Sequence, residues 1–443
     1  MTQPFITRRA AVGLGAGLLA STALPARAAI PVANVPDPNF RIEPGARLRV
    51  LRPAKYLEPD EVLFNANTQA FTAKTGIEVR VDYVNWPDMP VQVGVAFNTG
   101  QGADVIIAFG EHAHQFLDKL HDMTDLATYL GAKYGGWYDA ALLYGRKWKT
   151  DQWIGLPMGG SGGPALYRIS ALKAAGFDTV PKDTDSFLRL CKELKRLGKP
   201  CGFALGHAPG DAPAYANWLL WSHGGALVDE EGKVTLDNPA TLRAIDYARA
   251  MQETMIAGTM SWDGASNNRA FIAGDLGLTQ NGVSVYYALK TSTDATQRAL
   301  TADTDHAEMP YGLSAKVPQT ALTLNALVPK YTHYPNAAKE YIRFMMEVDQ
   351  YDKWLTGCLG YWSQPLKAYA HSAVWQSDPK LKVYSAAMDT PHHDGWRGPV
   401  SAASSAVAAN WILVDMFARV VTGQQSPQDS MREAQRAAQR WYR

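Results

Sequence analysis

Aromatic, amide and carboxylate side chains recur where the chain is expected to leave a strand. Asn85 and Trp86 follow the alternating segment 77–84, and Glu111 follows the apolar segment 104–108. Open α/β sheets bind ligands beyond the carboxyl ends of their parallel strands. Aromatic faces suit the C–H surface of a sugar ring, and amide or carboxylate oxygens satisfy its hydroxyls. These residue types therefore indicate a site for a small polar molecule.

Further aromatic residues lie at regular spacing or in loops. Trp218 and Trp221 are three residues apart and share one face of an expected helix. Tyr361 and Trp362 form a loop that Pro365 stops, and Trp396 lies in a stretch with glycine. A single tryptophan belongs to a core more often than to a ligand site. Several aromatics in loops are harder to explain by core packing, so we expect part of this set to line a cleft.

The glycine run 159–163 has Ser161 at its centre and matches the G-x-S-x-G signature of serine hydrolases. That signature needs a helix directly after the serine, whereas here Pro164 and a strand-like segment follow. We therefore favour an interlobe connection, in which backbone N–H groups of Gly160 and Gly162 approach a ligand. A secreted hydrolase that uses Ser161 stays open as the alternative from another class.

His112, His114 and His121 raise the question of a metal site. Side chains two residues apart on a helix point to different sides, so His112 and His114 do not converge. No spacing of cysteines or carboxylates supports a metal. The sequence predicts no metal and no cofactor.

The chain has 443 residues, 43 Lys+Arg against 42 Asp+Glu, and 47% hydrophobic residues. These values predict a globular protein of two domains or lobes, and the balanced charge argues against nucleic-acid binding. The three cysteines exclude a disulfide scaffold, while Cys191 and Cys201 are expected either to be bridged or to be buried free thiols. A monomer is expected.

The first 28 residues resemble a twin-arginine export signal. Arg8 and Arg9 precede a short apolar run, and the small-x-small pattern at 26–28 predicts cleavage after about Ala28. An ordinary Sec signal is the alternative, and either route predicts an exported protein. Without residues 1–28 the chain keeps 40 basic and 42 acidic residues, a net charge of −2. The proline-rich segment 29–45 is expected to be an extended leader.

Hydrophobic periodicity predicts alternating strands and helices, and hence an α/β fold. Strands are expected at 47–52, 77–83 and 104–108, with helices at 59–75 and 88–98 between them. This order implies a mostly parallel sheet with right-handed crossovers. Later strands are expected at 153–157, 165–168, 202–205, 271–279 and 319–328, and later helices at 185–197, 214–222, 239–257, 335–347, 349–357, 401–422 and 427–442.

Three stretches carry a family resemblance. They are 47–108, which includes NANTQAFTAKTGIEVRVDYVNW and GADVIIA; 234–282; and 334–365, which ends in GYWSQP. In their order and spacing they resemble the extracellular solute-binding proteins (family 1) of ABC importers, a group with many sugar-binding proteins. The resemblance covers nearly all of the chain after the export signal, and no single motif in it is diagnostic.

The resemblance implies a periplasmic-binding-protein type II fold, with two α/β lobes, a ligand cleft and a hinge. The crossings between lobes are expected near 157–164, 275–282 and 327–334. The N-terminal lobe would then contain 46–157 and 275–330, and the C-terminal lobe 158–274 and 331–443. The implied ligand residues are Asn85, Trp86, Glu111, Gly160, Ser161, Gly162, Trp218, Trp221, Asn281, Tyr286, Tyr361 and Trp362.

Taken together, these observations predict a periplasmic binding protein that delivers a sugar or sugar-like solute to ABC permease subunits. Two alternatives keep the binding role and change the ligand. Trp396 and Arg397 precede the expected helix 401–422, and an arginine beside a helix N-terminus suits an anionic polyol or sugar acid. Aromatic residues with Glu111 would suit a polyamine or quaternary amine. A sensory receptor in place of a permease is a further possible partner.

Overall fold

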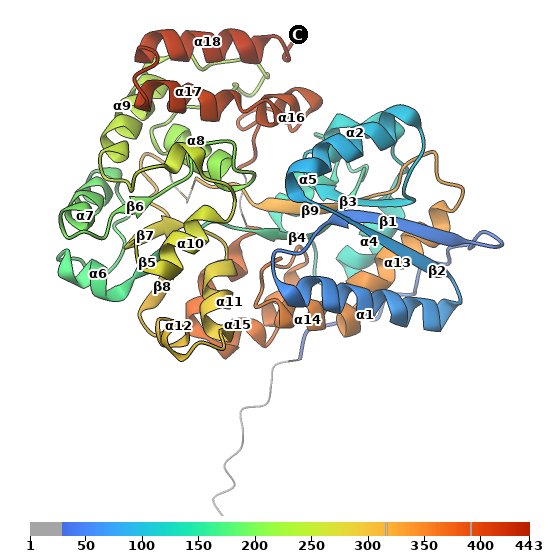
Figure 1. Cartoon of the computed structure of the whole chain (residues 1–443). Helices are drawn as coiled ribbons and strands as arrows, with labels where there is room; N and C mark the ends of the chain where they lie inside the picture. Colours follow the sequence, from blue (N-terminus) through green and yellow to red (C-terminus); the bar gives the residue numbers. More distant parts are fainter. Residues whose placement is uncertain (1–28, 315, 317, 390–391) are drawn as a thin grey trace, which may run out of the picture.

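The computed structural model describes residues 29–443 except 315, 317, 390 and 391. The expected export signal, 1–28, lies outside the described residues. The chain forms two lobes, each built around its own sheet (Figure 1). In that view lobe 1 is on the right, with α1 and α2, and lobe 2 is on the left, with α7 and α9.

The sheet of lobe 1 has the strand order β2-β1-β3-β9-β4. β1 pairs in parallel with β2 and β3, as the sequence predicts, whereas β9 runs antiparallel to both β3 and β4. The sheet is therefore mixed rather than mostly parallel. The strands are β1 (Arg47–Pro53), β2 (Glu78–Val84), β3 (Val105–Phe109), β4 (Leu156–Ser161) and β9 (Leu322–Leu327).

Helices from two separate parts of the chain cover this sheet. β3 is buried along its whole length and belongs to one hydrophobic core with residues of α1, α4, α13 and α14. The helices of lobe 1 are α1 (Glu58–Thr75), α2 (Met89–Thr99), α3 (His112–Gln115), α4 (Thr124–Lys133), α5 (Asp139–Gly145), α13 (Pro335–Met346), α14 (Val348–Gly357) and α15 (Val374–Ser377).

The sheet of lobe 2 is smaller, with the order β6-β7-β5-β8. Its strands are β5 (Ala165–Arg168), β6 (Cys201–Gly202), β7 (Leu278–Gln280) and β8 (Thr304–Ala307). Its helices are α6 (Ile169–Ala174), α7 (Thr184–Arg196), α8 (Asp211–Ser222), α9 (Pro239–Gln252), α10 (Ser266–Ala273), α11 (Ser284–Thr291), α12 (Ala295–Ala299), α16 (Ala402–Ala409), α17 (Ile412–Val421) and α18 (Pro427–Gln439). The described residues also form five 3-10 helices: Trp86–Asp88, Leu117–Lys119, Thr259–Ser261, Lys367–His371 and Pro379–Ala386.

Local sequence signals explain several helix ends. α9 begins after Asn238, whose side chain accepts hydrogen bonds from the N–H groups of Ala240 and Thr241, and Pro239 occupies its first turn. α1 ends at Gly76, which adopts a φ of 75°. Residues other than glycine rarely adopt this left-handed backbone conformation. Gly76 therefore ends the helix at the expected place.

The chain crosses between the lobes at three places, and only the first lies where the sequence predicts it. It runs between β4 and β5, across 162–164. The second crossing joins β8 to β9, because β7 and β8 both belong to the sheet of lobe 2. The third follows the 3-10 helix Pro379–Ala386, since Tyr384 and Met388 still pack in the core of lobe 1.

The expected lobe boundaries therefore need correction. Residues 278–307 pair in the sheet of lobe 2 instead of lobe 1. α13 and α14 pack on α1 in lobe 1, although the sequence placed 331–443 in the other lobe. Only the last three helices of that segment pack in the core of lobe 2. Amphipathic periodicity identifies a helix but does not indicate which sheet the helix covers. The helices were therefore expected correctly but assigned to the wrong lobe.

Two expected elements also differ from the structure. The segment 271–279 was expected to be a strand, whereas its first three residues form the end of α10, Gly274 terminates that helix at φ 84°, and only Leu278–Gln280 pairs as β7. The expected helix 401–422 is divided into α16 and α17 at Trp411. By length and composition alone Ala402–Val421 could cross a membrane, but 56% of it is buried inside the protein and α17 packs on α8 and α9.

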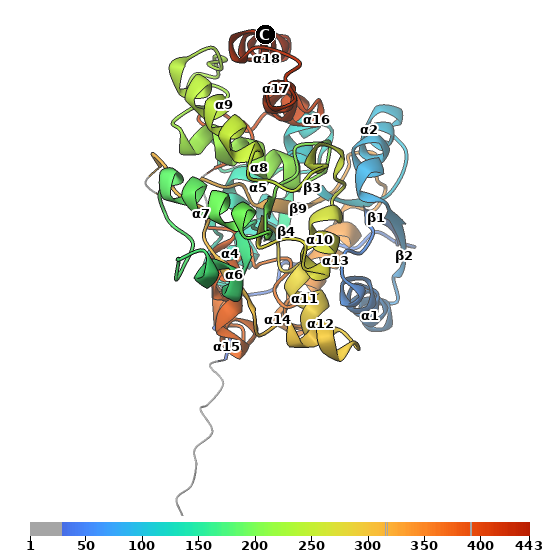
Figure 2. The ribbon, with the colours of Figure 1, turned by 60° about the vertical axis from the view of Figure 1, so that its left-hand side comes forward.

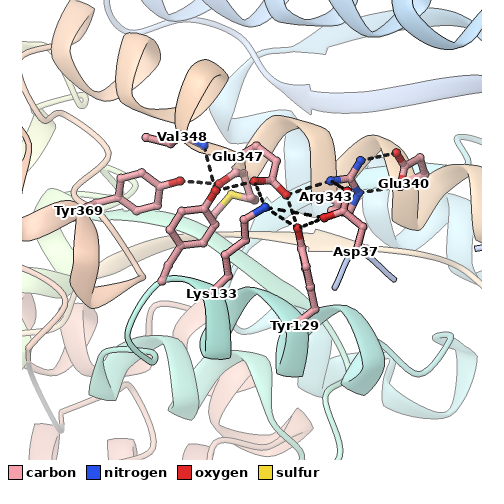
Figure 3. Close-up of polar contacts among 10 residues, drawn as sticks. Asp37, Tyr129, Lys133, Glu340, Arg343, Glu347, Val348 and Tyr369 are labelled. Atoms are coloured by element: carbon pink, nitrogen blue, oxygen red, sulfur yellow. Dashed lines mark hydrogen bonds and ion pairs between the residues drawn. The ribbon is translucent and has the colours of Figure 1, made fainter. Parts of the chain in front are cut away.

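The leader, defined as residues 29–45, contains no helix or strand and is attached to lobe 1. The Tyr129 hydroxyl donates to Asp37 Oδ1 at 2.6 Å, and Arg343 reaches the other carboxylate oxygen of Asp37 at 4.0 Å (Figure 3). Farther along, the Glu43 carboxylate accepts the N–H groups of Asn336 and Ala337 at the start of α13. The leader therefore holds α4 and α13 together.

All three cysteines are buried and free. Cys191 on α7 and Cys201 on β6 lie in the core of lobe 2, and burial and a hydrogen bond with Cys201 raise the pKa of the Cys191 thiol. Of the two expected states, the structure has the buried free thiols.

Candidate functional site

A pocket of about 620 Å³ lies between the lobes, at the ends of strands from both sheets. Turning the molecule brings lobe 2 forward and places α8 and α10 in front of strands of lobe 1 (Figure 2). The pocket is lined by Tyr56, Trp86, Ser161, Gly162, Gly163, Pro209, Gly210, Asp211, Ala214, Gly264, Gln280, Asn281, Gly282, Ser284, Thr320, Leu322 and Tyr361. Both lobes and the first crossing therefore contribute to one site.

Three aromatic rings of lobe 1 form one wall of this pocket. The ring of Tyr56 stacks on that of Tyr361, with centroids 6.2 Å apart, and meets the edge of Trp86 at 5.2 Å. The indole N–H of Trp86 donates to the backbone oxygen of Ala54 at 2.8 Å, which fixes the plane of that ring. These rings offer a preformed apolar surface to a ligand.

The opposite wall carries Asp211, in the first turn of α8. Gly210, immediately before it, has a φ of 83°, a conformation that favours glycine and turns the chain into the helix. Asn267 donates its amide N–H to Asp211 Oδ2 at 3.0 Å. Burial raises the pKa of the Asp211 carboxyl to about 7, and the bond from Asn267 opposes that shift. Of the described residues, Asp211 is the only charged one that lines the pocket.

The other polar groups of the pocket are mostly acceptors or are already paired. Gln280 donates its amide N–H to the oxygen of Gly163 at 2.9 Å, while its Oε1 is buried without a hydrogen-bond partner. Asn281 donates an amide N–H to Asn268 Oδ1. With Asp211, these groups give an acceptor-rich surface, which favours a ligand rich in hydrogen-bond donors.

One side-chain hydrogen bond crosses between the lobes beside the pocket. The Tyr56 hydroxyl of lobe 1 donates to the backbone oxygen of Gly264 in lobe 2. A Cβ atom at Gly264 would lie 3.2 Å from that hydroxyl, so glycine permits the close approach. Other contacts between the lobes lie elsewhere; in one of them Ser405 Oγ on α16 donates to the backbone oxygen of Glu111 at 3.1 Å. The lobes therefore touch at the pocket and away from it.

Five residues expected from the sequence line the pocket together: Trp86, Ser161, Gly162, Asn281 and Tyr361. Asn85 is exposed beside it and does not line it. Gly160 is buried within β4, where a Cβ atom would lie 2.1 Å from Met388 Sδ. Tyr286 is buried and donates to Asp378 at 2.6 Å.

The other expected tryptophans lie in cores. Trp218 and Trp221 are fully buried in lobe 2, where the indole N–H of Trp218 donates to the oxygen of Pro310 at 2.9 Å. Their spacing placed them on one face of α8, and that face is the core face. Trp362 is 2% exposed and stacks behind Trp86, with ring centroids 5.9 Å apart. It supports the pocket wall without lining it.

Glu111, Trp396 and Arg397 lie outside the pocket. Arg397 is exposed, and its guanidinium lies 5.0 Å from the ring centroid of Trp396. In the described residues Arg397 forms no ion pair. The geometry therefore gives the pocket no arginine that could bind an anionic ligand.

The histidines do not form a metal site. His112 Nδ1 contacts the oxygen of Phe109 and His114 Nε2 that of Leu143, and burial lowers the pKa of each to about 4. Among residues 29–443, with the four gaps given above, no group of three metal-binding side chains converges.

Asp211, Gln280 and Tyr56 line the pocket but were not expected from the sequence. The helix expected at 214–222 begins three residues earlier, so that its first turn carries Asp211 into the pocket. The segment Pro209-Gly210-Asp211 is a turn-and-helix-start signal that could have located this residue. No local signal marks Tyr56 or Gln280, because only the packing of the two lobes brings them together.

Solved structures share this architecture. The chain aligns with a solute-binding protein from Agrobacterium radiobacter K84, solved with ribitol, at a TM-score of 0.73 and 17% identity, over 89% of this chain and 98% of the other. It also aligns with a sugar transporter protein from Arthrobacter chlorophenolicus A6, solved with laminaribiose. That alignment has a TM-score of 0.74 and 15% identity, and it covers 89% of this chain and 99% of the other. At such identities the likeness shows the fold, a two-lobed periplasmic binding protein of type II as expected.

Sequence comparisons give the family. A curated relative, the putative ABC transporter periplasmic-binding protein YcjN of Escherichia coli (strain K12), is 25% identical over 252 residues. That alignment covers 56% of each protein, so the chain spans about half the length of this relative. The model of bacterial extracellular solute-binding proteins matches residues 66–383. The chain thus belongs to the bacterial extracellular solute-binding protein family.

Proposed function

We propose that this chain is the periplasmic binding subunit of an ABC importer, and that it takes a neutral sugar or polyol in the interlobe pocket. The observation that carries the proposal is the pairing of an aromatic wall with an acceptor-rich wall whose one charged group is Asp211. A sugar presents C–H faces to the rings of Tyr56, Trp86 and Tyr361, and donates hydroxyls to the opposite wall.

Charge distinguishes the ligand classes. A sugar acid would bring a carboxylate next to Asp211, with no cationic side chain among the described lining residues to compensate it. A cationic amine would match Asp211 electrostatically, but its alkyl chain lacks the several hydroxyls that a polyol can donate along the acceptor-rich wall. A polyol supplies several donors and no charge, so it satisfies both walls.

The relatives agree with this choice. Ribitol and laminaribiose are ligands of the two structural relatives described above, and YcjN is named as a periplasmic-binding protein of an ABC transporter. On this basis we propose delivery of the solute to permease subunits in the membrane, export into the periplasm, and cleavage of the export signal after about Ala28.

Binding rather than catalysis is the proposed role of Ser161. Its side chain lies in the pocket, and a Cβ atom at Gly282 would approach its Oγ to 2.7 Å. In the described part of the chain no histidine hydrogen-bonds Ser161, so the arrangement that activates a serine nucleophile is missing there.

Calorimetric titration tests the proposal. Ribitol, maltose and laminaribiose represent neutral ligands, gluconate an anion, and putrescine a cation; we expect heat of binding in the neutral group only. Ala214→Trp fills the pocket from α8 and should abolish that heat, whereas Ala299→Trp, at an exposed site on α12, should preserve it. Binding that persists in Ala214→Trp would place the solute elsewhere, and binding of putrescine or gluconate alone would overturn the neutral ligand.

A further inference from the structure

A second, smaller pocket of about 290 Å³ lies in lobe 2, between α8 and α17. Its walls are hydrocarbon, from residues of α8, α16 and α17: Pro213, Val407, Ala408, Ile412, Leu413 and Val414. Its polar groups are Asp394, on the third crossing, and Asn217, on α8. None of these residues lines the interlobe pocket, so the two sites are separate.

The polar groups of this pocket present acceptors. The amide N–H of Asn217 donates to Asp394 Oδ1 at 3.0 Å, which leaves the second carboxylate oxygen available. Asn217 is 3% exposed, and its Oδ1 is buried without a hydrogen-bond partner. A buried acceptor without a donor is costly, so its presence beside a carboxylate points to a missing donor.

Asp394 has no cationic partner among the described residues. Burial, and then repulsion by Glu111 of lobe 1, raise the pKa of Asp394 to about 7. Among the ion pairs of the described residues none involves Asp394 or Glu111. The neighbouring histidine, His393, accepts a hydrogen bond from the N–H of Gly395, and burial lowers its pKa to about 3, so it is neutral.

An aromatic ring completes the pocket at its rim. Trp411 lines it, and the ring of His207 stacks on that indole, with centroids 4.8 Å apart and planes 6° from parallel. His207 Nε2 lies 2.8 Å from Asp415 Oδ1, which holds the stack in place. A fixed indole next to a carboxylate is a favourable environment for an organic ammonium group.

We propose that this pocket binds a small primary alkylammonium ion, with its N–H groups donated to Asp394 and Asn217 Oδ1 and its alkyl part against Ile412 and Val414. A single proton shared between Asp394 and Glu111 would relieve their repulsion. It would not, however, account for the unpaired Asn217 oxygen or for the hydrocarbon walls. The alkylammonium ion accounts for all three observations.

Thermal unfolding with ethylammonium chloride as the probe tests this site. At pH 8, where Asp394 is ionised, ethylammonium chloride should raise the melting temperature above that in sodium chloride of equal ionic strength. Asp394→Asn should remove that difference. Asp389→Asn, at an exposed position on the same crossing, should retain it.

Further variants and salts identify the ion that binds in this pocket. Asn217→Leu should also lose the ethylammonium effect, and it keeps the test usable if Asp394→Asn folds poorly. Equal melting temperatures in the two salts, or an effect that survives in both pocket variants, would overturn the proposal. An equal effect of potassium chloride would assign the pocket to a bare ion and overturn it as well. Binding of neutral sugars, measured in parallel, reports on the interlobe pocket alone and separates the two proposals.

Discussion

At the scale of single residues, Asp211 is expected to favour ligand binding but to disfavour folding of the empty protein. Its carboxylate is the one charge on the described lining of the interlobe pocket, and it accepts a side-chain hydrogen bond from Asn267. A donor-rich ligand would supply the remaining hydrogen bonds. Until it does so, burial disfavours the ionised form. The residue that we expect to contribute most to binding therefore destabilises the empty protein.

Asp211→Asn should weaken binding of a neutral sugar or polyol by about 10- to 100-fold. A hydrogen bond to a charged group contributes roughly 1.5–3 kcal/mol, and the amide replaces half of the acceptor with a donor. Titration calorimetry at pH 8 would measure the loss. Asp246→Asn, at an exposed position on α9, should leave the affinity unchanged. An unaltered affinity in Asp211→Asn would show that the ligand does not contact this carboxylate.

The same variant should change the pH dependence of stability. The pKa of Asp211 is raised from its usual 3.8 to about 7, so folding favours the protonated acid. Stability from this group is complete below about pH 4 and is lost as the pH rises toward 7. The melting temperature of Asp211→Asn, relative to the wild type, should therefore increase between pH 4 and pH 7 and then level off. A constant difference across that range would contradict the raised pKa.

Two stacked tryptophans should respond differently to truncation. Trp86 lines the pocket and is partly exposed, so Trp86→Ala should reduce ligand affinity with a modest loss of stability. Trp362 is buried behind it, and Trp362→Ala should cost about 3–5 kcal/mol of unfolding free energy through the cavity it leaves. Urea denaturation and titration calorimetry of both variants would separate these effects. Equal losses of stability would contradict this division.

The sequence predicts pocket residues where they follow strand ends and fails where lobe packing decides. Trp86 follows β2, Tyr361 lies in an aromatic loop, and both line the pocket as expected. Trp218 and Trp221 have the same residue type but face the core, because helical spacing does not distinguish a core face from a cleft face. Asp211 was missed through an error of three residues in a helix start.

At the scale of elements, most strands and most of the longer helices were predicted, whereas short helices, the strand β8 and the assignment of elements to lobes were not. β1, β2 and β3 lie within a residue or two of their expected positions. The last three residues of α10 fall in the segment expected to be a strand, since this helix has only eight residues, about two turns, and a glycine follows directly. α13 and α14 belong to lobe 1, although the chain before them forms much of lobe 2. The hydrophobic periodicity of these two helices does not indicate which lobe they cover.

The leader should stabilise lobe 1 through the start of α13. Glu43 accepts the N–H groups of Asn336 and Ala337, at 2.9 and 3.1 Å, in the first turn of that helix. Glu43→Ala leaves those donors unpaired and should cost about 1 kcal/mol of unfolding free energy. Urea denaturation would measure it, with Glu231→Ala, in an exposed turn, as the control. A change no larger than in the control would mean that the leader does not stabilise the helix.

At the scale of the whole molecule, the two lobes line the interlobe pocket together and contact each other beside it. Tyr56 takes part in both functions: its ring stacks on Tyr361 in the pocket wall, and its hydroxyl donates to Gly264 of the other lobe. A ligand packed against the ring would fix the hydroxyl in position for that bond. Tyr56 therefore links occupancy of the pocket to the relative position of the lobes.

Tyr56→Phe should favour an open arrangement while preserving the aromatic wall. Loss of one hydrogen bond of about 1 kcal/mol corresponds to roughly fivefold faster release of the ligand. Stopped-flow kinetics would measure release, and solution X-ray scattering should give a larger radius of gyration for the variant with ligand. Tyr311→Phe, whose hydroxyl contacts Glu308 away from the pocket, serves as the control. Identical release rates for Tyr56→Phe and the wild type would exclude a role of this bond in closure.

The attachment of the leader has a practical consequence for measuring closure. Residues 29–45 are fixed to lobe 1 through Asp37 and Glu43, whereas α18, which ends at Gln439, packs on α17 in lobe 2 (Figure 1). The two ends of the described chain are thus attached to different lobes. A fluorophore pair at the two ends would convert each binding event into a change of energy transfer, without any label near the pocket. Labels at the two ends would therefore report any change in the relative position of the lobes.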